Sequence, residues 1–308
     1  MCIRDSYRPP GEGPYAAVLL FLGVQPARAS DPRVVNLGNA LARSNMAALY
    51  YWSSDMEQGI MTTKEIDNLV ASFQYLRNLD FVDPTRVGIG GFCVGGSFAL
   101  IAASDPLISN DVQFVNAFGP YFDMKELAIS IISETSEDNH GIQYWQPDKL
   151  SKKVLATHLT DKISNEEANI ITNWFTNNRT NNIDKTLLTE NGQRIHNLLG
   201  QKSRHGASDA FETLPAHNKS QLHQLSPSSH IADIKASILI MHDRNDSLVP
   251  VSHSRQLFEA LDGKTNVLFT EYGSIFDHVS PSLNSGTNTI TEMFRLAKHI
   301  QRIMLQST

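Results

Sequence analysis

The sequence predicts a doubly wound α/β fold with a mostly parallel sheet. Short apolar runs, typical of buried strands, alternate with segments that have helical spacing of their apolar residues. Such alternation forms right-handed crossovers, which keep neighbouring strands parallel and place helices on both faces of the sheet. The 308 residues, 41% of them hydrophobic, are sufficient for one large core.

The first predicted strand is the apolar run 17–22, which ends at Gly23. A continuous apolar run of this length is typical of a strand buried on both faces. Asp31 and Pro32 then supply an N-cap and a first-turn proline for a helix that extends to about residue 43.

A second buried strand covers residues 46–52, and the next helix follows a candidate capping box. That box is Thr62-Thr-Lys-Glu65, and apolar residues with helical spacing continue from it to residue 77. The remaining elements keep the alternation: strands at 86–90, 112–118, 237–242 and 267–272, and helices at 94–104, 252–261 and 287–306.

The strand pattern disappears between about Lys125 and Ser229, where polar residues become more frequent. Ser164-Asn-Glu-Glu167 and the apolar residues after it indicate helices there. We therefore predict one α/β core, residues 1–124 and 229–308, interrupted by a helical lid insertion, residues 125–228. The aromatic residues of this insertion either line a pocket beneath it or form its own small core: Tyr144, Trp145, Trp174 and Phe175.

Composition excludes several partners and compartments. The net charge is −6 and no basic run is present, so we expect no nucleic-acid partner. The longest apolar stretch is too short to cross a bilayer, and the first six residues lack the apolar region of a secretory signal. We therefore expect no membrane association and a cytoplasmic location. The oligomeric state stays open.

The spacing of potential ligands argues against metals and dinucleotides. The histidines of the insertion show no H-x-x-x-H spacing, and the two cysteines, Cys2 and Cys93, are too few for a disulfide framework. No G-x-G-x-x-G motif opens the first strand–helix unit. We expect no cofactor and no metal.

The most informative motif is G-x-C-x-G, which places Cys93 between Gly91 and Gly95. A predicted strand precedes it and a predicted helix follows it, which is the context of a nucleophile elbow. In such an elbow the central side chain projects above the sheet, and the next amide, that of Val94, faces the oxyanion that forms during acyl transfer. The alternative is a buried structural cysteine beside a tight turn.

A cysteine nucleophile needs a base, and the base needs an acid that orients it. Asp246 follows a buried strand and precedes Val249-Pro250, which places it at the carboxyl edge of the sheet. Asp243 is the competing acid, although as the first loop residue it is better suited to bind the turn. His278, after the last strand, is the predicted base.

Two further positions support this site. His242 ends a strand near Asp246, where it either assists the site or satisfies loop backbone. A second oxyanion amide is expected from the loop after the first central strand. We predict that Val24 supplies it, with Gly23 as the alternative.

These segments together resemble the dienelactone hydrolase family of the α/β-hydrolase superfamily. The resemblance rests on Gly91-Phe-Cys-Val-Gly-Gly96, His242-x-x-x-Asp246 and Phe276-Asp-His278. It implies the α/β-hydrolase fold and a Cys-His-Asp triad of Cys93, His278 and Asp246. Such a triad cleaves a small-molecule ester or lactone through an acyl-thioester enzyme without a cofactor.

The sequence departs from that family in three places. Phe21-Leu22 stands where family members carry a glutamate near the cysteine, and compact members lack the long insertion. Few residues precede the first strand, where this fold usually has an additional antiparallel hairpin, and whether the N-terminus is native or truncated stays open. An acyltransferase resembling polyhydroxyalkanoate synthase, and a catalytically silent hydrolase fold that binds a ligand or protein, remain as alternatives.

Overall fold

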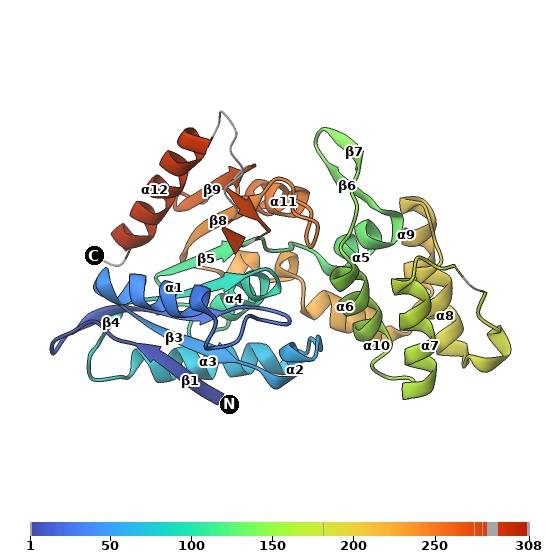
Figure 1. Ribbon diagram of the computed structural model, residues 1–308, viewed down its shortest axis with the longest axis horizontal. Helices are drawn as coiled ribbons and strands as arrows, with labels where there is room; N and C mark the ends of the chain where they lie inside the picture. The colour runs from blue at the N-terminus through green and yellow to red at the C-terminus, as the bar shows by residue number, and fades with distance from the viewer. Residues whose placement is uncertain (1, 181, 274, 279, 282–288, 307–308) are drawn as a thin grey trace.

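A computed structural model of the chain describes residues 2–180, 182–273, 275–278, 280–281 and 289–306. Its centre is a seven-stranded sheet in the order β1-β3-β2-β4-β5-β8-β9 (Figure 1). The strands are β1 (Cys2–Tyr7), β2 (Tyr15–Phe21), β3 (Met46–Trp52), β4 (Val82–Phe92), β5 (Phe114–Phe118), β8 (Ser237–Asp243) and β9 (Val267–Tyr272). Only β1 pairs antiparallel within this sheet, against β3, so the predicted doubly wound, mostly parallel architecture is confirmed.

Helices cover both faces of the sheet because successive side chains of a strand point to opposite sides. In β2, Leu19 belongs to the main core, which also contains residues of α3 (Lys64–Arg77), α4 (Val94–Ser104) and α11 (Ser252–Ala260). The next residue, Leu20, packs on the other face with residues of α1 (Pro32–Arg43) and α12 (Thr289–Gln306). A short helix, α2 (Ser54–Glu57), follows β3.

The structure differs from the predicted elements at several points. Strand β1 was not predicted, because its sequence CIRDSY has neither an apolar run nor a clean alternation. Helix α3 begins at Lys64 with Thr63 as its N-cap, and no side chain caps it, so the predicted capping box at Thr62 is wrong. The predicted start of the last helix at residue 287 lies outside the described residues.

The segment between β5 and β8 forms a separate group of helices beside the sheet (Figure 1). It contains α5 (Met124–Ser133), β6 (Thr135–Asp138), β7 (Gly141–Tyr144), α6 (Lys149–Leu159), α7 (Asn165–Thr176), α8 (Glu190–Leu199), α9 (Arg204–Glu212) and α10 (Ala216–Gln224). The β6–β7 hairpin was not predicted, since its strands are short and exposed or half-buried. We call residues 124–224 the insertion.

The buried hydrophobic residues described in the insertion continue the main core of the sheet and form no separate one. Phe175 of α7 and Leu198 of α8 are fully buried, whereas Tyr144 is exposed. Among the helices of the described ranges, none combines the length and apolar character needed to cross a membrane. A second short hairpin, β10 (Phe276–Asp277) with β11 (Ser280–Pro281), follows β9.

Candidate active site

Cys93 occupies the sharp turn between β4 and α4. Its backbone has φ 54° and ψ −130°, outside the regions that most L-residues adopt, and its amide donates a 2.7 Å hydrogen bond to the carbonyl of Phe118. A Cβ on Gly91 would lie 2.2 Å from the carbonyl oxygen of Gly95, and one on Gly95 would lie 2.2 Å from that of Phe21. Only glycine fits both positions, as the nucleophile-elbow interpretation requires.

Asp246 lies buried in the loop after β8. Its Oδ1 accepts hydrogen bonds from the amides of Leu248 (2.7 Å) and Val249 (3.0 Å), and its Oδ2 accepts one from Nδ1 of His278. Burial by itself raises the pKa of Asp246. The charge of His278 and the hydrogen bonds from two imidazoles outweigh that effect and hold this pKa well below its ordinary value. The carboxylate is therefore ionised.

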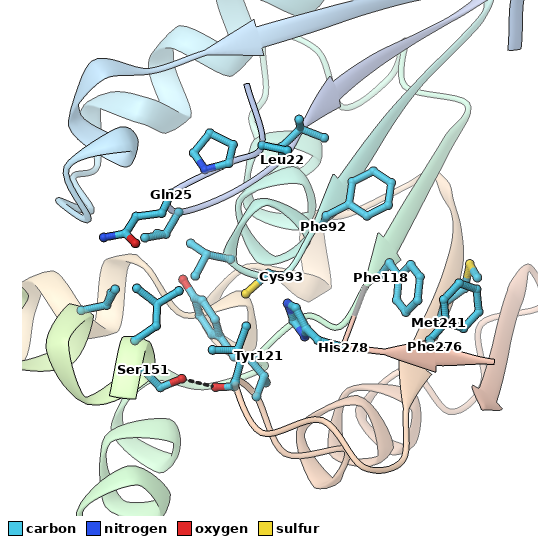
Figure 2. Close-up of a pocket in the computed structure, with 18 of the residues that line it drawn as sticks. Leu22, Gln25, Phe92, Cys93, Phe118, Tyr121, Ser151, Met241, Phe276 and His278 are labelled. Atoms are coloured by element: carbon cyan, nitrogen blue, oxygen red, sulfur yellow. Dashed lines mark hydrogen bonds between the residues drawn. The ribbon is translucent and has the colours of Figure 1, made fainter. Parts of the chain in front are cut away.

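His278 lies between Asp246 and Cys93 (Figure 2). Because Nδ1 donates to Asp246, Nε2 is the ring nitrogen available to the thiol. Burial lowers the pKa of His278, but the negative charges of Cys93 and Asp246, and its hydrogen bonds to both, raise it to about 11. The surroundings of His278 thus favour its imidazolium form. The three predicted triad side chains are brought together, from segments up to 185 positions apart (278 minus 93).

Asp243, the competing acid, accepts hydrogen bonds from backbone amides and none from the imidazole of His278. Its Oδ1 accepts from the amide of Asn245 (3.0 Å) and its Oδ2 from the amide of His278 (3.0 Å). Burial raises the pKa of this carboxyl. Since His278 has a φ of 56°, the hydrogen bond that its amide donates to Asp243 holds a backbone conformation that is unfavourable for a residue with a side chain.

His242 is fully buried behind Asp246. Its Nε2 donates to the carbonyl of Val249 (2.9 Å) and lies 3.4 Å from Oδ2 of Asp246, while its Nδ1 accepts from Oγ of Ser254 (2.6 Å). Both possibilities raised by the sequence therefore apply, because this imidazole satisfies loop backbone and contacts the acid of the site.

The two predicted oxyanion donors, Val24 and Val94, line the same cavity as Cys93. The loop that carries Val24 packs directly on the elbow: a Cβ on Gly23 would lie 3.5 Å from the amide nitrogen of Val94. Neither the amide of Val24 nor that of Val94 donates a hydrogen bond to another described residue. Both donors are thus available to a ligand, and their role as an oxyanion hole stays a prediction.

Three contacts that the sequence did not reveal join the insertion to the loop of Asp246. Nε1 of Trp145 donates a hydrogen bond to the carbonyl of Asp246 (2.7 Å). The amide of Asp148 donates to the carbonyl of Ser247 (2.8 Å), and Oγ of Ser151 donates to the carbonyl of Leu248 (2.8 Å). Trp145 is absent from the cavity lining. No spacing rule connects these residues, which lie about one hundred positions from their partners.

The cavity above Cys93 has a volume of about 780 Å³. Tyr121 and Ser151 lie on one side of Cys93, and Phe118, Met241 and Phe276 lie on the other side, beyond His278 (Figure 2). In the described parts of the chain, no group of three or more His, Cys, Asp or Glu side chains is arranged to hold a metal ion.

Comparisons with known proteins agree with this architecture. Residues 51–179, which include Cys93, match the model of the dienelactone hydrolase family. No curated protein sequence matches the chain. The solved structure of a 2,6-dihydroxy-pseudo-oxynicotine hydrolase is similar, with 14% sequence identity and a TM-score of 0.58. The match covers 97% of this chain but only 62% of the length of that hydrolase.

Two esterase structures cover the chain to a similar extent. Est1E from Butyrivibrio proteoclasticus has 12% identity and a TM-score of 0.50, over 97% of this chain and 93% of its own. Esterase Est2 from Thermogutta terrifontis has 14% identity and a TM-score of 0.52, over 96% and 85%. At these identities the structures establish a shared fold. Residues 51–179 are therefore similar to the dienelactone hydrolase family, and the chain as a whole has the α/β-hydrolase fold.

Proposed function

We propose that this protein hydrolyses a small-molecule carboxylic ester or lactone, with Cys93 as the nucleophile. The observation that carries the proposal is the position of His278. It bonds the buried carboxylate of Asp246 through Nδ1 and presents its other side to the thiol, at the floor of a cavity. An imidazole held in this way both activates a thiol and returns a proton to a leaving group.

The reaction proceeds in two halves. The thiolate of Cys93 attacks the carbonyl carbon, and the oxygen that becomes negative lies against the amides of Val24 and Val94. When the tetrahedral intermediate collapses, the C–O bond to the alcohol breaks and His278 gives its proton to the alcohol oxygen. The acyl group is now held as a thioester on Cys93.

Water completes the cycle. His278, now neutral, accepts a proton from a water molecule, which attacks the thioester carbonyl. The second tetrahedral intermediate releases the carboxylic acid and restores the thiolate and the imidazolium. No redox partner or further group is needed, since each proton that His278 gives up in the first half is recovered in the second.

The test uses p-nitrophenyl acetate and intact-protein mass spectrometry after an acid quench. We expect p-nitrophenol release and a mass increase of one acetyl group, which hydroxylamine removes. Both are lost in Cys93→Ala, whereas Ser97→Ala, one turn further along α4, retains them. Wild-type turnover in the alanine variant, or a folded wild-type protein that cleaves no ester or lactone, contradicts the proposal. Adding an alcohol acceptor and following acid release separates hydrolysis from acyl transfer.

A further inference from the structure

The cavity extends from Cys93 in two directions, which we name the insertion lobe and the face lobe. The insertion lobe is lined by side chains of α5 and α6: Met124, Leu127, Ala128, Ile131, Leu150, Val154 and Leu155. The face lobe is lined by Phe92, Phe118, Met241 and Phe276, and by Leu296, Ile300 and Ile303 of α12. Cys93, Val94 and His278 line the same continuous space.

The face lobe lies on the side of the sheet that α1 and α12 cover (Figure 1). Its floor comes from three adjacent strands, because Phe92 ends β4, Phe118 ends β5 and Met241 lies in β8. The rings of Phe118 and Phe276 are 4.8 Å apart at right angles, which packs one wall of this lobe. Phe276, which lies two residues before His278 in the sequence, therefore forms the start of the face lobe. From there the lobe extends beneath α12.

Apart from His278, which lies between them, the two lobes lack a charged group that could hold a carboxylate. Among the lining residues, all of them described, Arg33 is the only lysine or arginine, and it pairs with Asp31 at 2.8 Å on the exposed end of α1. Asn116, a polar residue of the cavity lining, accepts a 3.0 Å hydrogen bond from His299, and burial lowers the pKa of His299 to about 4. An anion placed in either lobe would lose its hydration without gaining a partner.

We propose that the substrate is an uncharged ester with an apolar group on each side of the scissile carbonyl, a proposal that rests on the proposed function. The leaving oxygen must face Nε2 of His278, since that nitrogen carries the proton. The alcohol group therefore extends past His278 into the face lobe, and the acyl group occupies the insertion lobe. Each lobe binds its group by removing apolar surface from water.

Two ester series test the two lobes separately. In the first, p-nitrophenyl esters run from acetate to decanoate, and in the second, acetate esters run from methyl to octyl alcohol. We expect kcat/KM to rise by up to about fourfold for each buried methylene in both series. An ester whose acyl chain ends in a carboxylate is expected to react at least ten times more slowly than its methyl-ended counterpart. Turnover of acetates with no rise in either series overturns this proposal and leaves the proposed function intact.

Two substitutions on α12 provide a matched pair. Ile300 is 46% exposed and lines the face lobe, whereas Met293 is 48% exposed and does not. Ile300→Asp is expected to remove the rise in the alcohol series and keep it in the acyl series. Met293→Asp is expected to keep both. Equal effects of the two variants, or loss in the acyl series alone, contradict the assignment of the lobes.

A binding measurement separates this proposal from the chemistry at Cys93. N-phenyl-1-naphthylamine is an uncharged fluorescent probe that needs no ester cleavage. Its Kd is expected to rise at least fivefold in Ile300→Asp and to change less than twofold in Met293→Asp. If Met293→Asp weakens binding as much, the probe occupies the outer surface of α12 and the face lobe is not a binding site. The binding measurement gives this answer whether or not the protein cleaves esters.

Discussion

The thiol of Cys93 and the imidazole of His278 influence each other at close range. Two of the effects that raise the pKa of His278 to about 11, the charge of the thiolate and its hydrogen bond, come from Cys93. In Cys93→Ala we therefore expect this pKa to fall by more than one unit, because only Asp246 still opposes burial. Nuclear magnetic resonance of the imidazole nitrogens against pH measures it. An unchanged pKa would show that the two groups do not interact.

Asp246 accepts the hydrogen on Nδ1 of His278, and it keeps that hydrogen on Nδ1 when the imidazole is neutral. Asp246→Asn keeps the size of the side chain but removes the charge, and its amide nitrogen can turn toward Nδ1. We expect kcat on p-nitrophenyl esters to fall by about 10³- to 10⁴-fold, as in other triads that lose this carboxylate. Asp243→Asn is the comparison, since Asp243 touches only backbone amides. An equal loss in both variants would remove the distinction between the two acids.

At the scale of elements, the insertion supports the loop that carries Asp246. Residues 145–151 donate three hydrogen bonds to the carbonyls of residues 246–248. The β6–β7 hairpin adds an ion pair to the core, between Asp138 and Arg255 of α11 at 2.6 Å, and Arg255 also binds Glu271 of β9 at 2.7 Å. These contacts connect the insertion to the loop of Asp246 and to α11, which follows that loop.

Trp145→Phe tests that connection. The substitution keeps most of the ring but removes the Nε1–H that binds the carbonyl of Asp246, a loss of about 1 kcal/mol of hydrogen bonding. We expect kcat to fall about tenfold with a small change in Tm, since a displaced acid loop misorients His278. Trp174→Phe, in α7 of the same insertion and away from the loop, is expected to retain kcat. Equal values of kcat in the two variants would show that the bond does not position the triad.

At the scale of the whole molecule, buried histidines make stability depend on pH. Burial lowers the pKa of His253 to about 3 and that of His299 to about 4, so both are neutral in the folded protein at pH 5. In the unfolded chain, histidines with ordinary pKa values bind protons below about 6.5. The unfolded state then binds more protons, and the free energy of unfolding falls as the pH drops.

We expect a loss on the order of 2 kcal/mol for each of these histidines between pH 7 and pH 5. The raised pKa of His278 acts in the opposite direction: its stabilising effect is complete below about 6.5 and is lost as the pH rises toward 11. Urea unfolding at several pH values measures the acidic loss. His253→Asn should reduce its slope, and His205→Asn, at an exposed position, should not. Equal slopes in wild type and His253→Asn would contradict this account.

Local pattern was sufficient for most of the fold. Apolar runs and helical spacing predict the central strands and the helices of the core, because burial on a sheet face or a helix face imposes a fixed period. Strand β1 and the β6–β7 hairpin were not predicted, because short strands without alternating apolar and polar residues have no periodic pattern in the sequence. The capping box at Thr62 was wrong because a matching residue pattern does not decide which residue leaves the helical conformation.

The candidate site divides in the same way. Cys93, Asp246 and His278 could be predicted because each follows a predicted strand and the order of the chain connects them, and because a glycine-flanked turn marks Cys93. By itself, the sequence determined the alternation that builds the sheet and the turn that exposes one thiol. Only the tertiary structure decided how far the cavity extends on each side of that thiol and which insertion residues hold the acid loop. These depend on contacts between segments about one hundred residues apart, where no periodic pattern links the partners and the packed chain alone brings them together.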